Sequence, residues 1–236
     1  MPLETVTVPA RFSGPPNSGN GGYTCALLAH HAGNPAEVTL RKPIPIDRAM
    51  QITHDADTWK LSAGDELIAE AKPTQISLDL IRPVTFTEAQ HAAEQSPAFK
   101  NHPFPTCFVC GPQRAAGDGL RIFPGIVRDN EIGHVFASPW IPAKEFAELS
   151  GHIKPEFIWS AMDCPTGFAG GFPYQGKLVT GRLAVHQLAP VKAGEHCVIM
   201  SWPLGVEGRK HHAAAALYGE DQTARATAKA TWIKLD

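Results

Sequence analysis

One carboxylate of the chain lies in an otherwise apolar segment. Residues 154–168 read Lys-Pro-Glu-Phe-Ile-Trp-Ser-Ala-Met-Asp-Cys-Pro-Thr-Gly-Phe, and apolar residues recur there at helical spacing. Asp163 falls inside this apolar stretch, where an unpaired carboxylate costs roughly several kcal/mol. The carboxylate can therefore serve as a base or a nucleophile of raised basicity. It can equally be a structural aspartate that caps or pairs near a helix end.

The cysteines offer two further kinds of chemistry. Cys107-Phe-Val-Cys110 has the spacing of a metal-binding pair, but a structural zinc ion needs four ligands and the chain has no second pair of this kind. His102 and His134 are conceivable partners without diagnostic spacing, so we predict no metal and a tight turn at this pair. Cys164 can act as a nucleophile, yet no base partner is recognisable in the sequence, and packing is the favoured interpretation.

Composition limits the class of protein. The chain has 236 residues, of which 43% are hydrophobic, and a formal net charge of -2, which favours one large or two small cores and argues against nucleic-acid binding. No apolar run reaches the roughly 18 residues of a membrane span. The start of the chain lacks the pattern of a signal peptide, and the 5 cysteines are an odd number, so we expect reduced thiols and a cytoplasmic protein without cofactor.

Two similar halves follow one another in the chain. In the first half we expect strands at 5–12, 37–43, 50–54 and 66–72, a buried helix at 21–32, and a polar helix at 85–96 with a capping box from Thr85 to Glu88. In the second half we expect strands at 119–123, 134–138, 178–188, 196–202, 213–218 and 224–235, and the apolar helix at 154–168, which Pro165 and Gly167 should end. The predicted domains are 1–96 and 107–236, joined by a linker at 97–106.

Short segments support the repeat. Residues 40–47 parallel 185–192, where a strand runs into a proline step, and 67–72 parallel 223–228. Each half then consists of one apolar helix and a run of antiparallel strands. An apolar helix without a polar face must be covered, and a sheet wrapped around it achieves this. The predicted fold class is therefore α+β.

These residues resemble a known family. Residues 107–122 are similar to the Cys-Phe-x-Cys-Gly…Gly-Leu-x-Leu opening of hotdog thioesterases of the phenylacetate-degradation type. Gly21-Gly-Tyr-Thr-Cys-Ala-Leu resembles their His-Gly-Gly-Tyr…Ala-Leu helix start, and Ala161-Met-Asp-Cys resembles a Leu-Asp step later on that helix. The resemblance covers residues 11–235 and implies a double hotdog, with both helices packed back to back against one continuous sheet.

The resemblance also implies an activity, the hydrolysis of an acyl thioester carried by coenzyme A or an acyl carrier protein. In this family an N–H group at the start of one helix polarises the thioester carbonyl, and a carboxylate of the facing helix activates water. Here the first helix has Gly21 and Gly22 but Ala29 at the position of the carboxylate, whereas the second has Asp163 but begins Lys-Pro-Glu. The two halves together would form one complete site.

The remaining assignments depend on the same resemblance. Asn20 replaces the family's histidine and would position the acyl group or water, although it also suits a helix N-cap. Tyr23 and Trp159 are candidate substrate contacts, and Trp159 equally suits the core. Arg209 and Lys210 are candidate contacts to phosphates, although a solvated basic turn would look the same.

Two other functions stay open at this stage. A hotdog hydratase or dehydratase would need a histidine near the helix, and His152 precedes Pro155 by a few residues. A non-catalytic acyl-ligand binder is compatible with Ala29 and with the Lys-Pro-Glu start. The resemblance further implies that double hotdogs can pair into a homodimer.

Overall fold

The computed structural model describes residues 4–172 and 176–235. The helices are α1 (Gly21–Ala32), α2 (Phe86–Glu94) and α3 (Pro155–Ala169). The strands are β1 (Glu4–Thr7), β2 (Ala36–Leu40), β3 (Ala49–Asp55), β4 (Thr58–Ala63), β5 (Glu66–Pro73), β6 (Gly125–Asp129), β7 (His134–Trp140), β8 (Leu178–Gln187), β9 (Cys197–Glu207), β10 (Lys210–Tyr218) and β11 (Ala224–Lys234). None of the described helices is long and apolar enough to cross a membrane.

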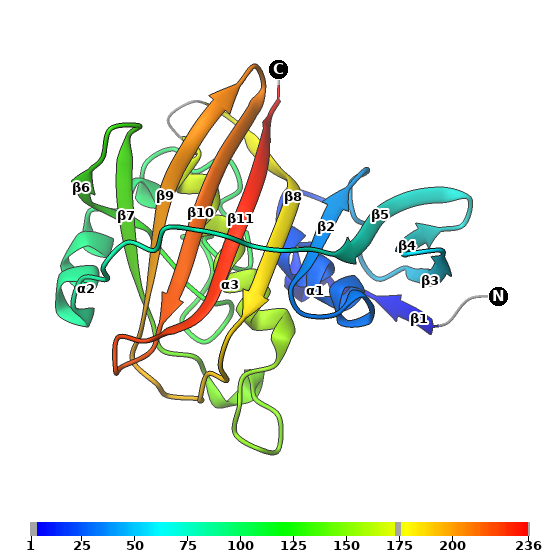
Figure 1. The fold of residues 1–236 in the computed structure, drawn as a ribbon, viewed down its shortest axis with the longest axis horizontal. Helices are drawn as coiled ribbons and strands as arrows, with labels where there is room; N and C mark the ends of the chain where they lie inside the picture. Colours follow the sequence, from blue (N-terminus) through cyan, green and yellow to red (C-terminus); the bar gives the residue numbers. More distant parts are fainter. Residues whose placement is uncertain (1–3, 173–175, 236) are drawn as a thin grey trace.

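All strands belong to one antiparallel sheet, in the order β1-β3-β4-β5-β2-β8-β11-β10-β9-β7-β6 (Figure 1). The run β1-β3-β4-β5-β2 corresponds strand by strand to β7-β9-β10-β11-β8, with β6 added at the edge. In each run the helix, α1 or α3, precedes the strand at the centre of the whole sheet. The halves join at β2 and β8, where Ala36 lies opposite Val185 and Thr39 lies opposite Arg182. The predicted α+β architecture of two helix-and-sheet halves is confirmed.

The two central helices pack directly against each other, as predicted. A Cβ atom on Gly22 of α1 would lie 2.6 Å from the Trp159 carbonyl oxygen and 2.8 Å from the Asp163 Cβ of α3. Only glycine therefore allows the first turn of α1 to approach α3 this closely. From Phe157 to Ala169 every residue of α3 is buried, because the helix packs against both the sheet and α1, which lies beside it (Figure 1).

The opposite face of the sheet has its own apolar cover. The extended segment 74–85 crosses it between β5 and α2 (Figure 1). Leu78, Ile81 and Val84 pack there against side chains of β9 and β10, and the Tyr218 hydroxyl donates a hydrogen bond to the Ile81 carbonyl oxygen at 2.6 Å. Helix α2 starts with the predicted capping box between Thr85 and Glu88 and packs on β6 and β7 of the second half. The domain boundary at residue 96 stays a prediction.

Several predicted elements were wrong. Helix α3 has nearly the predicted bounds, but Pro165 and Gly167 lie inside it and do not end it. The buried Trp232 packs on its last turn and donates from Nε1 to the Thr166 hydroxyl at 2.9 Å. Tertiary packing outweighs the unfavourable helix propensity of proline there.

Two strand predictions also needed correction, and two strands, β4 and β6, were not predicted. Residues 119–123 form no strand, because Arg121 has a φ of 53°, which an extended chain cannot adopt. The first strand ends at Thr7, before a 3-10 turn at Ala10–Phe12, and β4 was not predicted. β4 escaped prediction because its sequence, Thr-Trp-Lys-Leu-Ser-Ala, is short and weakly apolar.

Candidate active site

Asp163 lies in the middle of α3, where its side chain faces the first turn of α1 and is only 1% exposed. Its Oδ2 accepts hydrogen bonds from the backbone N–H of Gly22 at 2.9 Å and from the Asn20 side-chain amide at 3.4 Å. Its Oδ1 accepts a hydrogen bond from the Thr180 hydroxyl of β8 at 2.7 Å. Three donors from α1 and β8 thus fix the orientation of the carboxylate.

Asn20 has two roles that the sequence presented as alternatives. Its Oδ1 accepts a hydrogen bond from the Tyr23 backbone N–H at 2.9 Å, which makes it the N-cap of α1. Its amide nitrogen points to the Asp163 carboxylate. One side chain therefore starts α1 and contacts the acidic residue of α3.

The environment of Asp163 changes its proton affinity. The pKa of the carboxyl is raised from 3.8 to about 7. Burial is the main cause and the neighbouring Cys107 contributes, while the hydrogen bonds from Thr180, Gly22 and Asn20 oppose the shift. A carboxyl with this pKa exchanges protons near neutral pH, as a general base must.

Gly21 presents a backbone donor beside this carboxylate. As the first residue of α1 its N–H has no partner within the helix, and no hydrogen bond to it is found among the described residues. A Cβ atom at this position would lie 2.9 Å from the Thr180 hydroxyl and 3.2 Å from Asp163 Oδ2. The absent side chain leaves the N–H open to a ligand, and helix N-terminal N–H groups favour negative charge. The Gly22 N–H, in contrast, is already bonded to Asp163.

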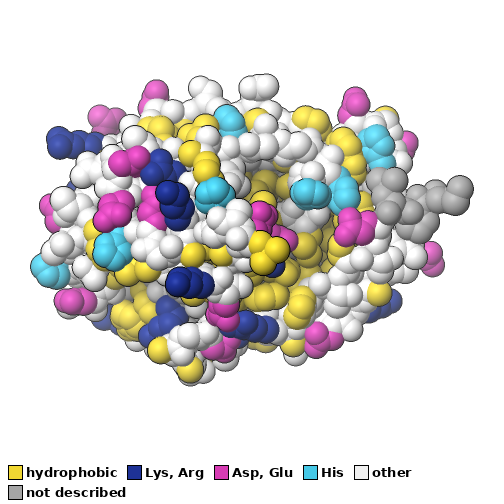
Figure 2. All heavy atoms as spheres, turned by 90° about the horizontal axis from the view of Figure 1, so that it is seen from below, with side chains coloured by type: hydrophobic (Ala, Val, Ile, Leu, Met, Phe, Trp, Pro, Cys, Tyr) yellow, Lys and Arg dark blue, Asp and Glu magenta, His cyan; other side chains and the backbone are white. Residues whose placement is uncertain are grey.

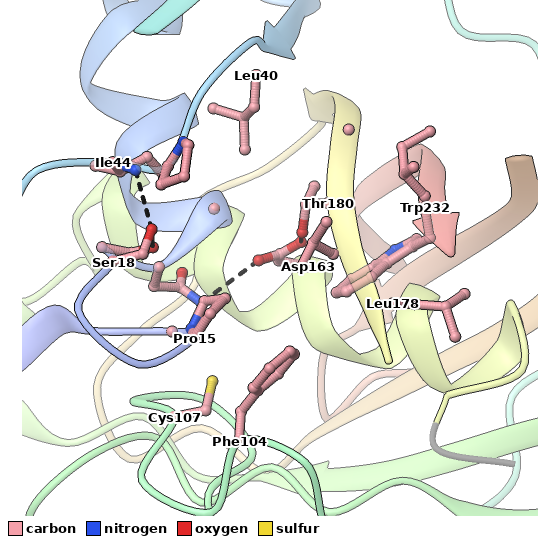
Figure 3. A pocket seen from close by; sticks show the side chains of 18 of the residues that line it. Pro15, Ser18, Leu40, Ile44, Phe104, Cys107, Asp163, Leu178, Thr180 and Trp232 are labelled. Atoms are coloured by element: carbon pink, nitrogen blue, oxygen red, sulfur yellow. Dashed lines mark hydrogen bonds between the residues drawn. The ribbon is translucent and has the colours of Figure 1, made fainter. Parts of the chain in front are cut away.

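A cavity of about 430 Å³ opens in front of Asp163 and Gly21, between the two halves (Figure 3). Its wall is mostly apolar and includes Pro15, Pro16, Leu40, Ile44, Phe104, Phe172, Leu178 and Trp232. This volume lies in the range of small-molecule pockets, roughly 300–1,000 Å³. Asp163 and Thr180 belong to its wall, near the middle of the view in Figure 3, and the sulfur of Cys107 points toward the cavity.

Three buried cysteines meet beside the cavity and line it. The sulfur atoms of Cys107, Cys110 and Cys164 all lie within 4.8 Å of one another. Hydrogen bonds from the other two thiols and from the N–H groups of Val109 and Cys110 hold the pKa of the Cys107 thiol well below its ordinary value. Burial raises the pKa of Cys110, and the hydrogen bond with Cys107 raises that of Cys164. Cys107 is therefore the sulfur at which this cluster favours a thiolate.

The other predicted substrate contacts lie elsewhere. The Tyr23 ring stacks on Phe12, with 4.2 Å between ring centroids, and Trp159 is buried in the core; neither lines the cavity. Arg209 and Lys210 are exposed at the turn between β9 and β10. Lys210 pairs in register with Ile233, which does line the cavity, so this turn lies at the same end of the sheet. Their roles in binding stay predictions.

The sequence missed two contributors to the site. Thr180 holds Asp163 from β8, and a threonine in a strand carries no signal of such a contact. Cys164 was assigned to packing, because nothing in the sequence placed it beside the Cys107-x-x-Cys110 pair. His102 and His134 lie outside the cysteine cluster, and no described histidine lines the cavity.

The pseudo-equivalent position in the other half lacks both functional groups. Counted from the first residue of each helix, the ninth residue is Asp163 in α3 and Ala29 in α1. The first residue is Gly21 in α1 and Pro155 in α3, and proline has no N–H to offer. Within the described residues, the arrangement at Asp163 therefore has no counterpart at the start of α3.

Comparisons with known proteins identify the fold. No family model matches the chain, and no curated protein matches its sequence. The tesB protein of Mycobacterium avium subspecies paratuberculosis is similar in structure with a TM-score of 0.63 and 9% identity, over 98% of this chain and 92% of that chain. A conserved protein of unknown function with a hotdog fold from Alicyclobacillus acidocaldarius gives a TM-score of 0.54 and 10% identity, over 98% and 93%. The PaaI protein of E. coli, from its phenylacetic acid degradation operon, aligns with 46% of this chain and 81% of its own, with a TM-score of 0.41 and 11% identity. The two full-length likenesses show that this chain has the hotdog fold, in its double form.

Proposed function

From the double hotdog fold and the cavity at Asp163, we propose that this protein hydrolyses an acyl thioester at a single composite site between its halves. One observation carries the proposal. Asp163, from α3, and Gly21, from α1, line the same apolar cavity, and the Gly21 N–H has no hydrogen-bond partner among the described residues. One half would supply the base and the other the donor for the developing oxyanion.

Thioester hydrolysis at this site would need only two functional groups of the protein. Ionised Asp163 takes a proton from a water molecule, whose oxygen attacks the carbonyl carbon of the thioester. The Gly21 N–H donates to the oxyanion of the tetrahedral intermediate, where the helix N-terminus favours negative charge. When the carbon–sulfur bond breaks, the thiolate departs without prior protonation, because a thiol has a pKa of about 8.5. One carboxylate therefore suffices for a thioester, and the proton that it holds passes to the thiolate or to solvent.

The proposal assigns different roles to the two glycines. The Gly22 N–H is bonded to Asp163 and would hold the base in place, which leaves Gly21 as the oxyanion donor. Asn20 orients the carboxylate and the start of α1 together. Thr180 fixes the second carboxylate oxygen.

The cavity wall suggests the nature of the substrate. Its apolar side chains suit an apolar acyl group. Arg41 and Lys42 also line the cavity, and the Arg209-Lys210 turn lies at the same end of the sheet. Cationic side chains at the mouth suit the phosphates of coenzyme A or of a phosphopantetheine carrier. We therefore propose an acyl-CoA or acyl carrier thioester as the substrate.

One face of the molecule carries charges of both signs. On the face in Figure 2, cationic and anionic side chains alternate among the described residues, and hydrophobic side chains gather near its middle. That nucleic acid is not the ligand stays a prediction.

The test is product formation from a panel of short, long and aromatic acyl-CoAs, with free coenzyme A and the fatty acid quantified by chromatography. We expect saturable turnover with one acyl class and its loss in Asp163→Asn. Asp57→Asn, at an exposed turn, serves as the matched control and should retain turnover. Turnover that persists in folded Asp163→Asn would refute the role of this carboxylate.

A second candidate function has support from one observation. Both oxygens of Asp163 are already hydrogen-bonded and the side chain is buried, as expected for a structural carboxylate under a ligand-binding cavity. Tight binding of an acyl-CoA without turnover over hours would favour this non-catalytic binder. The hydratase alternative has no such support, because His152 does not line the cavity.

A further inference from the structure

The cysteine cluster beside the cavity joins two segments that are far apart in the sequence. Cys107 and Cys110 belong to the irregular segment before β6, and Cys164 belongs to the buried helix α3. The sulfur atoms of Cys107 and Cys164 lie 3.7 Å apart, and that of Cys110 lies within 4.8 Å of both. The other two cysteines, Cys25 and Cys197, are also buried but lie outside this cluster.

The first two sulfurs are presented by a tight turn. The Gly111 N–H donates to the Cys107 carbonyl oxygen at 2.9 Å, which closes the loop Cys107-Phe-Val-Cys110-Gly111. A Cβ atom on Gly111 would lie 2.5 Å from the Cys107 backbone nitrogen, so only glycine fits there. This turn directs both thiols to one side, toward Cys164.

We propose that Cys107, Cys110 and Cys164 bind a zinc ion through their three sulfur atoms, with the fourth coordination position facing the cavity. Binding releases the protons of the coordinating thiols and involves no oxidation or reduction. The site differs from the prediction of no metal, which counted only ligands recognisable by spacing.

The sulfur positions fit the geometry of zinc. A zinc–sulfur bond of about 2.3 Å in a tetrahedron gives a distance of roughly 3.8 Å between sulfur atoms. The distance of 3.7 Å between the sulfurs of Cys107 and Cys164 matches this edge. The sulfur of Cys110 lies within 4.8 Å of the other two sulfurs, so it needs to approach them by at most about 1 Å to complete the triangle.

The fourth position follows from the contacts of the neighbouring carboxylate. The Asp163 carboxylate, held in place by Gly22, Asn20 and Thr180, does not belong to the group of ligand atoms that lie within 4.8 Å of one another. Among the described residues no other histidine, cysteine or carboxylate joins the group. All three cysteines line the cavity, so the remaining ligand is water or a group of the bound molecule.

Charge favours zinc over a monovalent thiophilic ion. Three thiolates and a divalent cation leave one net negative charge, whereas three thiolates and copper(I) leave two. The cluster is buried beside the Asp163 carboxylate, where each uncompensated negative charge is costly. The divalent ion is therefore the better match.

The test uses the full chain, expressed in zinc-supplemented medium and purified without chelators. Elemental analysis should find about one zinc ion per chain. Cys110→Ser should reduce the zinc content to background, whereas Cys197→Ser, a buried cysteine of β9 outside the cluster, should retain it. Cobalt(II) added to the metal-free wild-type chain should give sulfur-to-cobalt charge-transfer absorption and the intense visible bands of a tetrahedral ion. This second measurement needs no variant and holds even if Cys110→Ser fails to fold.

Three outcomes would overturn the proposal. The first is folded, reduced wild-type protein that contains no zinc and gives no cobalt bands. The second is equal zinc content in folded Cys110→Ser and Cys197→Ser, which would place the metal elsewhere. The third is a purified chain that contains copper and does not bind zinc. None of these measurements uses turnover, so their outcome is independent of the proposed hydrolase activity.

Discussion

The Asp163 carboxylate and the Gly22 backbone N–H lie 2.9 Å apart, which ties the middle of α3 to the first turn of α1. The absent side chain of Gly22 lets the two helices approach, and the same contact buries the carboxylate. Asp163 is thus part of the interface between the halves as well as a candidate base. The predictions below separate these two roles.

Asp163→Asn should stabilise the protein relative to the wild type at pH 8 more than at pH 4. The pKa of Asp163 is about 7 in the fold, against 3.8 as the ordinary value. Between these values the unfolded chain ionises and the folded chain does not, so wild-type stability falls as pH rises toward 7 and then levels off. The cost reaches roughly 4 kcal/mol at most, and asparagine does not incur it. Denaturant unfolding of both metal-free chains at the two pH values measures the difference, and a difference independent of pH would contradict the raised pKa.

Thr180→Val should reduce turnover at neutral pH and move the pH profile upward. Its hydroxyl donates to Asp163 Oδ1 at 2.7 Å and favours the ionised form. Without this donor the pKa of Asp163 rises, and less of the base is ionised at neutral pH. Rates of thioester hydrolysis across pH provide the measurement, with Thr180→Ser as the variant that keeps the hydroxyl. An unchanged profile in Thr180→Val would show that this hydrogen bond does not tune the base.

Two substitutions of Asn20 separate its role as helix cap from its contact with Asp163. Asn20→Ser keeps an oxygen that can accept from Tyr23 N–H, so the helix cap survives, but its hydroxyl is too short to reach Asp163 as the amide does. We expect stability close to that of the wild type with lower turnover. Asn20→Ala loses both contacts and should cost about 1 kcal/mol of unfolding free energy in addition. Thermal unfolding and steady-state kinetics compare the pair, and full activity in Asn20→Ser would limit this residue to capping.

The Arg209-Lys210 turn should matter for the carrier rather than for the chemical step. Replacing both residues by glutamine removes two exposed cations at the end of the sheet where the cavity opens. We expect KM for an acyl-CoA to rise severalfold with little change in kcat, and the dependence of KM on salt to weaken. Glu131→Gln, which also alters an exposed charge in a turn, is the control. If KM stays unchanged, the phosphates bind elsewhere, with Arg41 and Lys42 of the cavity wall as the next pair to replace.

The sequence by itself determined the elements and the unusual character of a few residues. Apolar residues at helical spacing predicted the buried helix α3, and a proline-free stretch that ends before Gly33 predicted α1. Alternation in β11 predicted a half-exposed antiparallel strand, because local periodicity records which face is buried. Asp163 stood out since a carboxylate in an apolar helix needs a reason. The capping box at Thr85 was readable because it depends on residues within one turn.

Only the tertiary structure decided which of these residues meet. Asn20 and Asp163 are separated by 143 positions in the chain, and no local pattern states that one helix start faces the middle of another helix. The contact of Thr180 with Asp163 likewise depends on the packing of α3 against β8. The contact of Cys164 with Cys107 depends on the packing of α3 against the segment that contains Cys107. Pro165 is a local signal to end a helix, yet α3 continues past it, because Trp232 packs on the last turn. Contacts between distant segments arise from the shape of the whole core, and the sequence encodes that shape only collectively.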